Sequence, residues 1–135
     1  MTPKRRRQVG KYLRKIANGL ELRDWTVHVM RGDPHNPNHG AAMEAVYGQR
    51  VVRVWIRADL FDYPPAEQRQ TLVHELVHVH TSAMAAMVRE TLPGQMAPQA
   101  HEVFEREFTR QVEHAVDALA EAVAPRFPLP PWCRD

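Results

Sequence analysis

Two histidines and a glutamate stand in this chain where they could hold and use a metal ion. They belong to the segment His74-Glu75-Leu76-Val77-His78, an HExxH motif, inside a run from Thr71 to Val88 that has the composition of a helix. Residues four apart lie above one another on a helix, so both imidazoles can reach one ion. Glu75 points toward the same cleft, where it can take a proton from a water that the metal activates.

The neighbours of the motif indicate that this helix is buried. Two histidines and a glutamate in such surroundings would be costly unless something binds them. This favours a metal site over ordinary surface or core histidines. Apolar residues stand on nearly every side of the helix: Leu72, Val73, Leu76, Val77 and Val79.

A third protein ligand is expected, because catalytic zinc is held by three protein groups and keeps one position open. The HExxHxxGxxH pattern of metzincins does not supply it, since Thr81 and Met84 stand where the glycine and the third histidine should be. His80 faces away, because two residues past His78 it lies about 200° round the helix. The cysteines of the nucleobase deaminases are also missing. A carboxylate from the last predicted helix is the remaining source.

That helix offers four candidates for the third ligand. Glu113 is favoured because Asp117 follows one turn later on the same face, where it can hold a ligand imidazole by its second nitrogen. Glu102 lies eleven residues earlier on that face and remains the alternative ligand. One turn after Glu102 comes Arg106, whose charge would repel a metal ion. The four candidates are Glu102, Glu105, Glu107 and Glu113.

Length and composition predict one globular domain. The 135 residues are 44% hydrophobic and 25% charged, which is ordinary for a soluble protein. We expect a single domain over residues 1–124 and an extended, proline-rich tail over residues 125–135. The single cysteine, Cys133, excludes an internal disulfide and fits a reducing compartment. Without an apolar run of membrane-spanning length or a signal peptide, the sequence predicts a cytoplasmic protein that does not contact a membrane.

Basic residues are concentrated at the N-terminus, although the net charge is only +2. A basic segment can contact nucleic acid or an anionic surface, and it can equally be the solvated face of a helix. No RNP, helix-turn-helix or zinc-finger pattern accompanies it, so the solvated face is the favoured interpretation. The basic residues of this N-terminal segment are Lys4, Arg5, Arg6, Arg7, Lys11, Arg14 and Lys15.

Hydrophobic periodicity predicts three helices and three strands in the order α-β-β-β-α-α. The second and third strands are joined by Gly48-Gln49-Arg50, a hairpin connection that makes the small sheet mainly antiparallel. The apolar stripe of the first helix should be Val9, Tyr12, Leu13 and Ile16. On the third strand Val52, Val54 and Ile56 should face one way. The apolar stripe of the last helix should be Phe104, Phe108, Val112, Ala115 and Leu119. The predicted elements are a helix over 3–18, strands over 25–30, 42–47 and 51–57, the motif helix over 65–90, and a last helix over 99–124.

With these pieces the chain resembles the small single-domain zincin metallopeptidases of phage and bacterial genomes, the minimal gluzincin type related to SprT-like proteins. The resemblance rests on Leu22–Val27 before the first strand, Leu72–His78, and Glu113–Ala120. It implies a zincin-like α+β fold with an N-terminal helix, a small sheet, the HExxH helix and a C-terminal helix that carries the third ligand. The residues it assigns are the Zn²⁺ ligands His74, His78 and Glu113, the general base Glu75, and Asp117 behind a ligand imidazole.

The resemblance also implies a reaction and a way of binding. The reaction is hydrolysis of peptide bonds in a peptide or protein substrate. The substrate would lie extended along an edge strand of the sheet, either residues 42–47 or residues 51–57. A tyrosine or histidine should stabilise the oxyanion. The candidates for this role are His101, His114, Tyr47 and Tyr63.

Two other functions fit the same residues. The protein could be a DNA-associated protease, recruited to nucleic acid through its basic N-terminal arm as SprT-like proteins are. It could also be a non-catalytic binding module that keeps the zinc, with the proline-rich tail as a docking peptide. A salt-dependent shift on DNA would favour the first alternative. A function that survives Glu75→Gln would favour the second.

Overall fold

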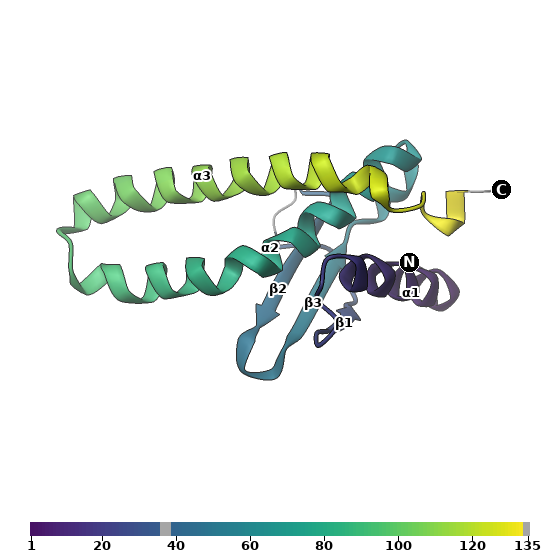
Figure 1. Ribbon diagram of the computed structural model, residues 1–135, viewed down its shortest axis with the longest axis horizontal. Coiled ribbons are helices and arrows are strands. Elements are labelled where there is room, and N and C mark those ends of the chain that lie inside the picture. Colours follow the sequence, from purple (N-terminus) through teal and green to yellow (C-terminus); the bar gives the residue numbers. More distant parts are fainter. Residues whose placement is uncertain (36–38, 134–135) are drawn as a thin grey trace.

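The computed structural model describes residues 1–35 and 39–133. Within these residues it is an α+β fold of three α-helices and one three-stranded sheet, in the predicted order (Figure 1). Short 3-10 turns join several of the elements. The helices are α1 (Pro3–Gly19), α2 (Pro65–Thr91) and α3 (Pro98–Val123), and the strands are β1 (Thr26–Val29), β2 (Ala41–Val46) and β3 (Val51–Ile56).

The sheet is mixed, and the prediction of a mainly antiparallel sheet is corrected here. β3 is central, with β2 antiparallel on one side and β1 parallel on the other. Only β2 and β3 are joined by a tight connection, the 3-10 turn Tyr47–Gln49 followed by Arg50 in the left-handed conformation. The chain after β1 instead crosses to the far side of β3, so β1 ends up parallel to it. Of the two strands considered as a substrate-binding edge, β2 is therefore an edge strand and β3 is not.

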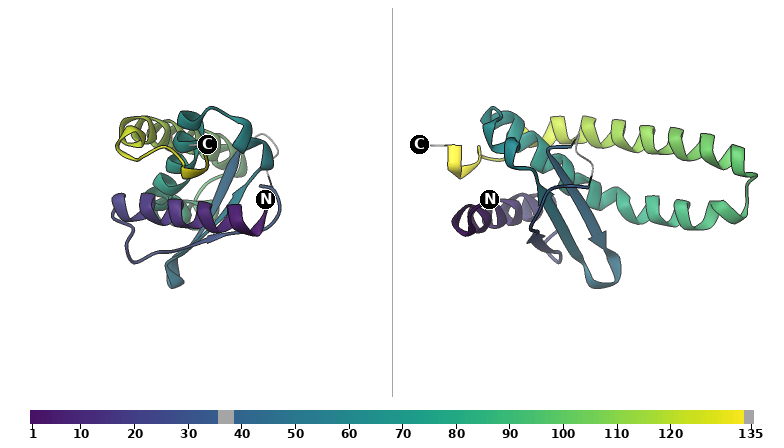
Figure 2. Two further views of the ribbon diagram at one scale, coloured as in Figure 1. Left: turned by 90° about the vertical axis from the view of Figure 1, so that its right-hand side faces the viewer. Right: turned by 180° about the vertical axis from the view of Figure 1, so that it is seen from behind.

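The helices α1 and α2 cover one face of the sheet (Figure 2). Along β3 the side chains alternate as predicted, because Val52, Val54 and Ile56 are buried while the residues between them are partly exposed. α1 faces the same core with a stripe at helical spacing. That stripe, also predicted, is Val9, Tyr12, Leu13 and Ile16, and all four residues are buried.

α2 and α3 form an antiparallel hairpin whose outer part projects well beyond the sheet (Figures 1 and 2). We call residues 82–110 the arm, and Ala85 is the only buried residue in it. The predicted stripe of α3 is wrong at its C-terminal end: Val116 and Ala120 are buried, whereas Ala115 and Leu119 are exposed. The stripe continues from Val112 in steps of four residues, and the residue before each of these positions is turned about 100° away. No helix in the described residues could cross a bilayer.

The C-terminal tail packs against the domain instead of remaining extended. It contains two short 3-10 turns, Ala124–Arg126 and Pro131–Cys133. Trp132 is only 8% exposed and belongs to the hydrophobic core. Its indole Nε1 donates a hydrogen bond of 2.7 Å to the side-chain oxygen of Gln68, a buried residue of α2. This bond gives a buried indole N–H the acceptor that it needs.

Candidate metal centre

His74 and His78 lie one turn apart on α2 and direct their Nε2 atoms toward the same point. The two nitrogens are 3.0 Å apart, and both side chains are about four-fifths buried. The backbone beneath them is fixed, because Leu72 and Leu76 on the same helix are fully buried in the core. The predicted helical spacing therefore does bring both imidazoles to one site.

Glu113 on α3 faces the two imidazoles from the opposite helix. One of its carboxylate oxygens, Oε2, lies 3.5 Å from Nε2 of His74, and the other, Oε1, lies 3.3 Å from Nε2 of His78. Asp117, one turn further along α3, places its Oδ1 2.9 Å from Nδ1 of His74. A proton on Nδ1 leaves the lone pair of Nε2 directed at the shared site.

Glu102, the alternative third ligand, is not part of this group. Among the described residues, the cluster that could hold a metal ion consists of His74, His78 and Glu113. Glu102 is exposed on the arm, eleven residues earlier, which is roughly 16 Å along the helix. The turn between α2 and α3 sets which glutamate comes opposite the histidines, and the structure brings Glu113 there.

The spacing of the three donor groups is close to that around a bound metal ion. Zinc bonds of about 2.0–2.1 Å imply neighbouring donor atoms about 3.3–3.4 Å apart. The two imidazole nitrogens are 3.0 Å apart, and the nearer Glu113 oxygen, a different one for each histidine, lies 3.3 Å from His78 and 3.5 Å from His74. Two imidazole nitrogens and a carboxylate oxygen are also ligand types that zinc accepts. The chemistry and geometry of this cluster are therefore those of a site that could bind such an ion.

Glu75 lies beside the cluster and is 6% exposed. Burial raises the pKa of its carboxyl to about 7, and the negative charge of Glu113 adds to the increase. A carboxyl group with this pKa can both take up and release a proton near neutral pH. Burial also lowers the pKa of His78, although Glu113 partly opposes this, so the imidazole is neutral and able to bind a metal at pH 7.

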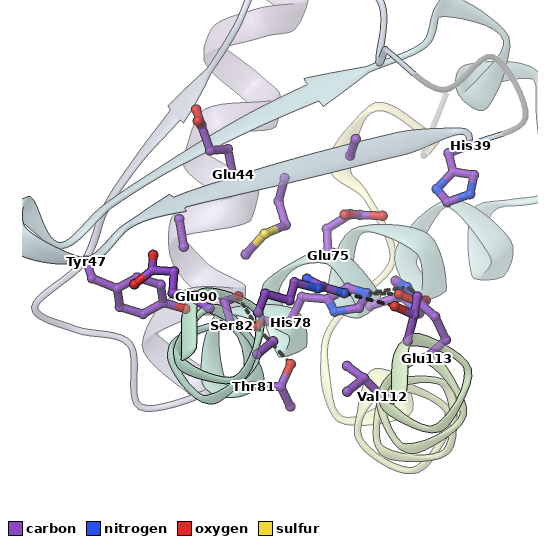
Figure 3. Close-up of a pocket in the computed structure, with 18 residues that line it drawn as sticks. His39, Glu44, Tyr47, Glu75, His78, Thr81, Ser82, Glu90, Val112 and Glu113 are labelled. Atoms are coloured by element: carbon purple, nitrogen blue, oxygen red, sulfur yellow. Dashed lines mark hydrogen bonds and ion pairs between the residues drawn. The ribbon is translucent and has the colours of Figure 1, made fainter. Parts of the chain in front are cut away.

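A cleft of about 520 Å³ runs over the cluster, between β2 on one side and α2 and α3 on the other (Figure 3). Four successive residues of β2, Ala42 to Ala45, line it. Successive side chains of a strand point to opposite faces, so β2 must present its edge to the cleft. A second cavity of about 270 Å³ lies on the Asp117 side of His74 and shares His74 and Glu75 with the first. Space is thus available on both sides of the cluster.

The four residues predicted as oxyanion stabilisers are placed differently. Tyr47 lines the cleft, but its hydroxyl donates a hydrogen bond of 3.4 Å to the backbone carbonyl of Val79. The other three do not line either cavity beside the cluster. They are His101, which pairs with Glu105 at 3.5 Å, His114, exposed on α3, and Tyr63, which is 38% exposed.

His80 and His39 are two further histidines whose positions relative to the cluster can be compared with the sequence. His80 faces away from the cluster, as predicted, with Nε2 2.8 Å from the carbonyl oxygen of Leu20. His39, which sequence reasoning did not single out, lines both cavities. It stands in a segment without periodicity, and its only sequence signal is its place just before a predicted edge strand.

Comparison with models of protein families, with curated proteins and with solved structures finds no match to this chain.

Proposed function

We propose that the protein is a zinc-dependent metallopeptidase, a small zincin of the minimal gluzincin type that the sequence resembles. The observation that carries the proposal is the convergence of His74, His78 and Glu113, which bring one ligand atom each within 4.8 Å of the others, beside the buried carboxyl of Glu75. When bound, zinc would acidify the attacking water and polarise the scissile carbonyl. The edge of β2 supports a peptide substrate, because it offers unpaired backbone groups along the cleft.

Each residue of the site has a separate task in this reaction. Glu75 takes one proton from the water as its oxygen bonds to the carbonyl carbon, and passes that proton to the amine when the C–N bond breaks. Asp117 keeps the His74 ring in the orientation that turns Nε2 to the metal. The α2–α3 hairpin holds Glu113 against the two histidines. One water is consumed, and the products are a carboxylic acid and an amine.

The test combines metal analysis with peptide hydrolysis. We expect one zinc per chain in the wild type, and loss of that zinc in His74→Ala, because two remaining ligands hold the ion poorly. Glu75→Gln should keep the zinc and lose hydrolysis by roughly 10²-fold or more. The zinc-loaded wild type is offered a mixture of capped peptides of diverse sequence, with Glu67→Gln as control, since Glu67 is exposed on the same helix. No cleavage of any peptide, or full activity in Glu75→Gln, would overturn the proposal.

A DNA-associated peptidase is the second candidate, and the surface of α1 favours it. Five basic side chains are exposed on the side of α1 opposite its buried stripe, and α1 contains no acidic residue. Such a row can follow a phosphate backbone. The test is a DNA mobility shift at increasing salt, in which binding should weaken steeply and be lost when the row is changed to alanine. The row consists of Lys4, Arg7, Lys11, Arg14 and Lys15.

The binding-module alternative has less support from the structure. Its docking peptide would be the proline-rich tail, but Pro130 and Trp132 of that tail are buried against the domain. A buried carboxyl with a pKa of about 7 beside the cluster also has a use in catalysis that a binding module would not require. Glu75→Gln distinguishes the two functions, because only catalysis depends on the base.

A further inference from the structure

We propose that His39 is a catalytic residue, which donates a hydrogen bond to the carbonyl oxygen of the scissile bond as negative charge develops on it. This inference rests on the proposed function. It adds a hydrogen-bond donor for the oxyanion, which the metal ligands and Glu75 do not provide. Acyl-transfer sites place such donors where the oxyanion forms. Of the four residues predicted for this role only Tyr47 lines the cleft, and its hydroxyl donates to the backbone carbonyl of Val79.

The position of His39 is the first argument. It lines the 520 Å³ cleft and also the 270 Å³ cavity, and the residues common to both are His39, His74 and Glu75. It therefore lies where the two spaces meet, and its side chain is exposed there. Figure 3 shows its ring on the side of β2 where the Glu75 carboxylate also lies, facing His78 and Glu113. His39 comes from the sheet side of the cleft and Glu75 from the helix side, so a carbonyl between them would meet a donor and a base from two directions.

The second argument is that the other side-chain donors along the cleft already donate hydrogen bonds to other groups. The hydroxyls of Thr81 and Ser82 both donate to the backbone carbonyl of His78. Arg89 donates to Glu105 at 3.0 Å and to Thr109 at 3.1 Å, which ties its guanidinium to the arm. Tyr47 is bonded to Val79, as described above. The ring nitrogens of His39, by contrast, make no hydrogen bond or ion pair with another residue in the described part of the chain, and a neutral or protonated imidazole always has an N–H to donate.

The third argument is that the backbone next to His39 is anchored. The carbonyl of Gly40 accepts a hydrogen bond of 2.9 Å from the backbone N–H of Arg57, at the end of β3. A Cβ at Gly40 would lie 3.2 Å from Cδ1 of Leu60, closer than an ordinary contact, so this position packs tightly against the turn before α2. The ring of His39 therefore begins from a fixed point at the end of the sheet, as an oxyanion donor requires.

The test uses a stable mimic of the charged transition state beside a neutral ligand. Zinc-loaded protein is titrated calorimetrically with an N-phosphoryl dipeptide and with the capped dipeptide that lacks the phosphoryl group. His39→Ala should weaken binding of the phosphoryl compound on the order of 10²-fold, as for a lost oxyanion donor, and leave binding of the neutral dipeptide and the zinc content unchanged. His39→Gln, which keeps an N–H donor, should recover part of the loss. In hydrolysis, His39→Ala should lower kcat and leave KM nearly constant.

His35→Ala is the matched control, because His35 belongs to the same connection and its ring lies 6.1 Å from the ring of Trp55, away from the cleft. Equal binding of the phosphoryl compound by wild type and His39→Ala would overturn the inference. Loss of zinc in His39→Ala would also overturn it, because His39 would then act on the metal. If the wild type hydrolyses no peptide but His39→Ala still loses affinity for the phosphoryl compound alone, the donor role stands and the peptidase function fails.

Discussion

Replacing Glu75 by glutamine should stabilise the metal-free protein, by an amount that grows as pH rises from about 4.5 to about 7 and is constant above that. The carboxyl of Glu75 has a pKa of about 7 in the folded chain, against 4.5 when unperturbed. The folded state therefore binds more protons than the unfolded state between these values, so the contribution of Glu75 to stability falls as pH rises through this window. A difference of one pKa unit corresponds to about 1.4 kcal/mol, so the ionised group costs roughly 3 kcal/mol above pH 7.

The assay is urea unfolding of the chelator-treated wild type and Glu75→Gln at several pH values from 4.5 to 8. Contributions of all other groups cancel when the two free energies of unfolding are subtracted. The difference should grow by roughly 3 kcal/mol in favour of the glutamine variant between the ends of the range. A flat difference for Glu75→Gln would show that burial beside Glu113 does not hinder ionisation, and the reasoning would fail.

Four other predictions concern the ligands and the tail. Glu113→Ala should lower zinc affinity sharply, whereas Glu102→Ala should leave it unchanged; competition with a chromogenic chelator measures both, and equal affinities would refute the ligand assignment. In the same assay Asp117→Ala should lower affinity about 10–100-fold, as for lost support of a ligand imidazole. Zinc affinity of the wild type should be nearly constant above pH 7 and fall below about pH 6, because His78 is neutral at pH 7 and protonation removes its lone pair. Trp132→Ala should lower the free energy of unfolding by roughly 3–5 kcal/mol in a urea titration, and a change below 1 kcal/mol would mean that the tail does not contribute to the core.

The parts of the fold that depend on nearby residues could be predicted from the sequence. The stripe of α1 and the alternation along β3 are set by helical and strand periodicity, and both are confirmed. The order of the strands depends on how the connection after β1 crosses the sheet, and no local pattern records that path. The burial of Trp132 against Gln68 joins residues far apart in the chain, so a segment rich in proline could be interpreted only as an extended tail.

The same distinction separates the residues of the candidate site. His74 and His78 meet because four residues make about one helical turn, which the sequence states directly. Glu113 could be preferred over Glu102 only through its neighbour Asp117, because the turn between the helices decides which of them faces α2. His39 could not be recognised in advance, since its position at the cluster depends on the end of the sheet and on contacts of Gly40.

A metal ion bound by His78 and Glu113 would also restrain the arm, residues 82–110. From His78 the chain runs out along α2, turns at the tip and returns along α3 to Glu113, so an ion held by both residues would close the base of the hairpin. Because the three ligands meet only in the folded chain, the ion would stabilise this hairpin by its binding free energy. The arm has little else to restrain it, because Ala85 is its only buried residue and the ion pair of Arg89 with Glu105 is exposed. Occupancy of the metal centre and stiffness of a surface far from it would therefore be coupled, and the wall of the cleft would be most rigid when the ion is bound.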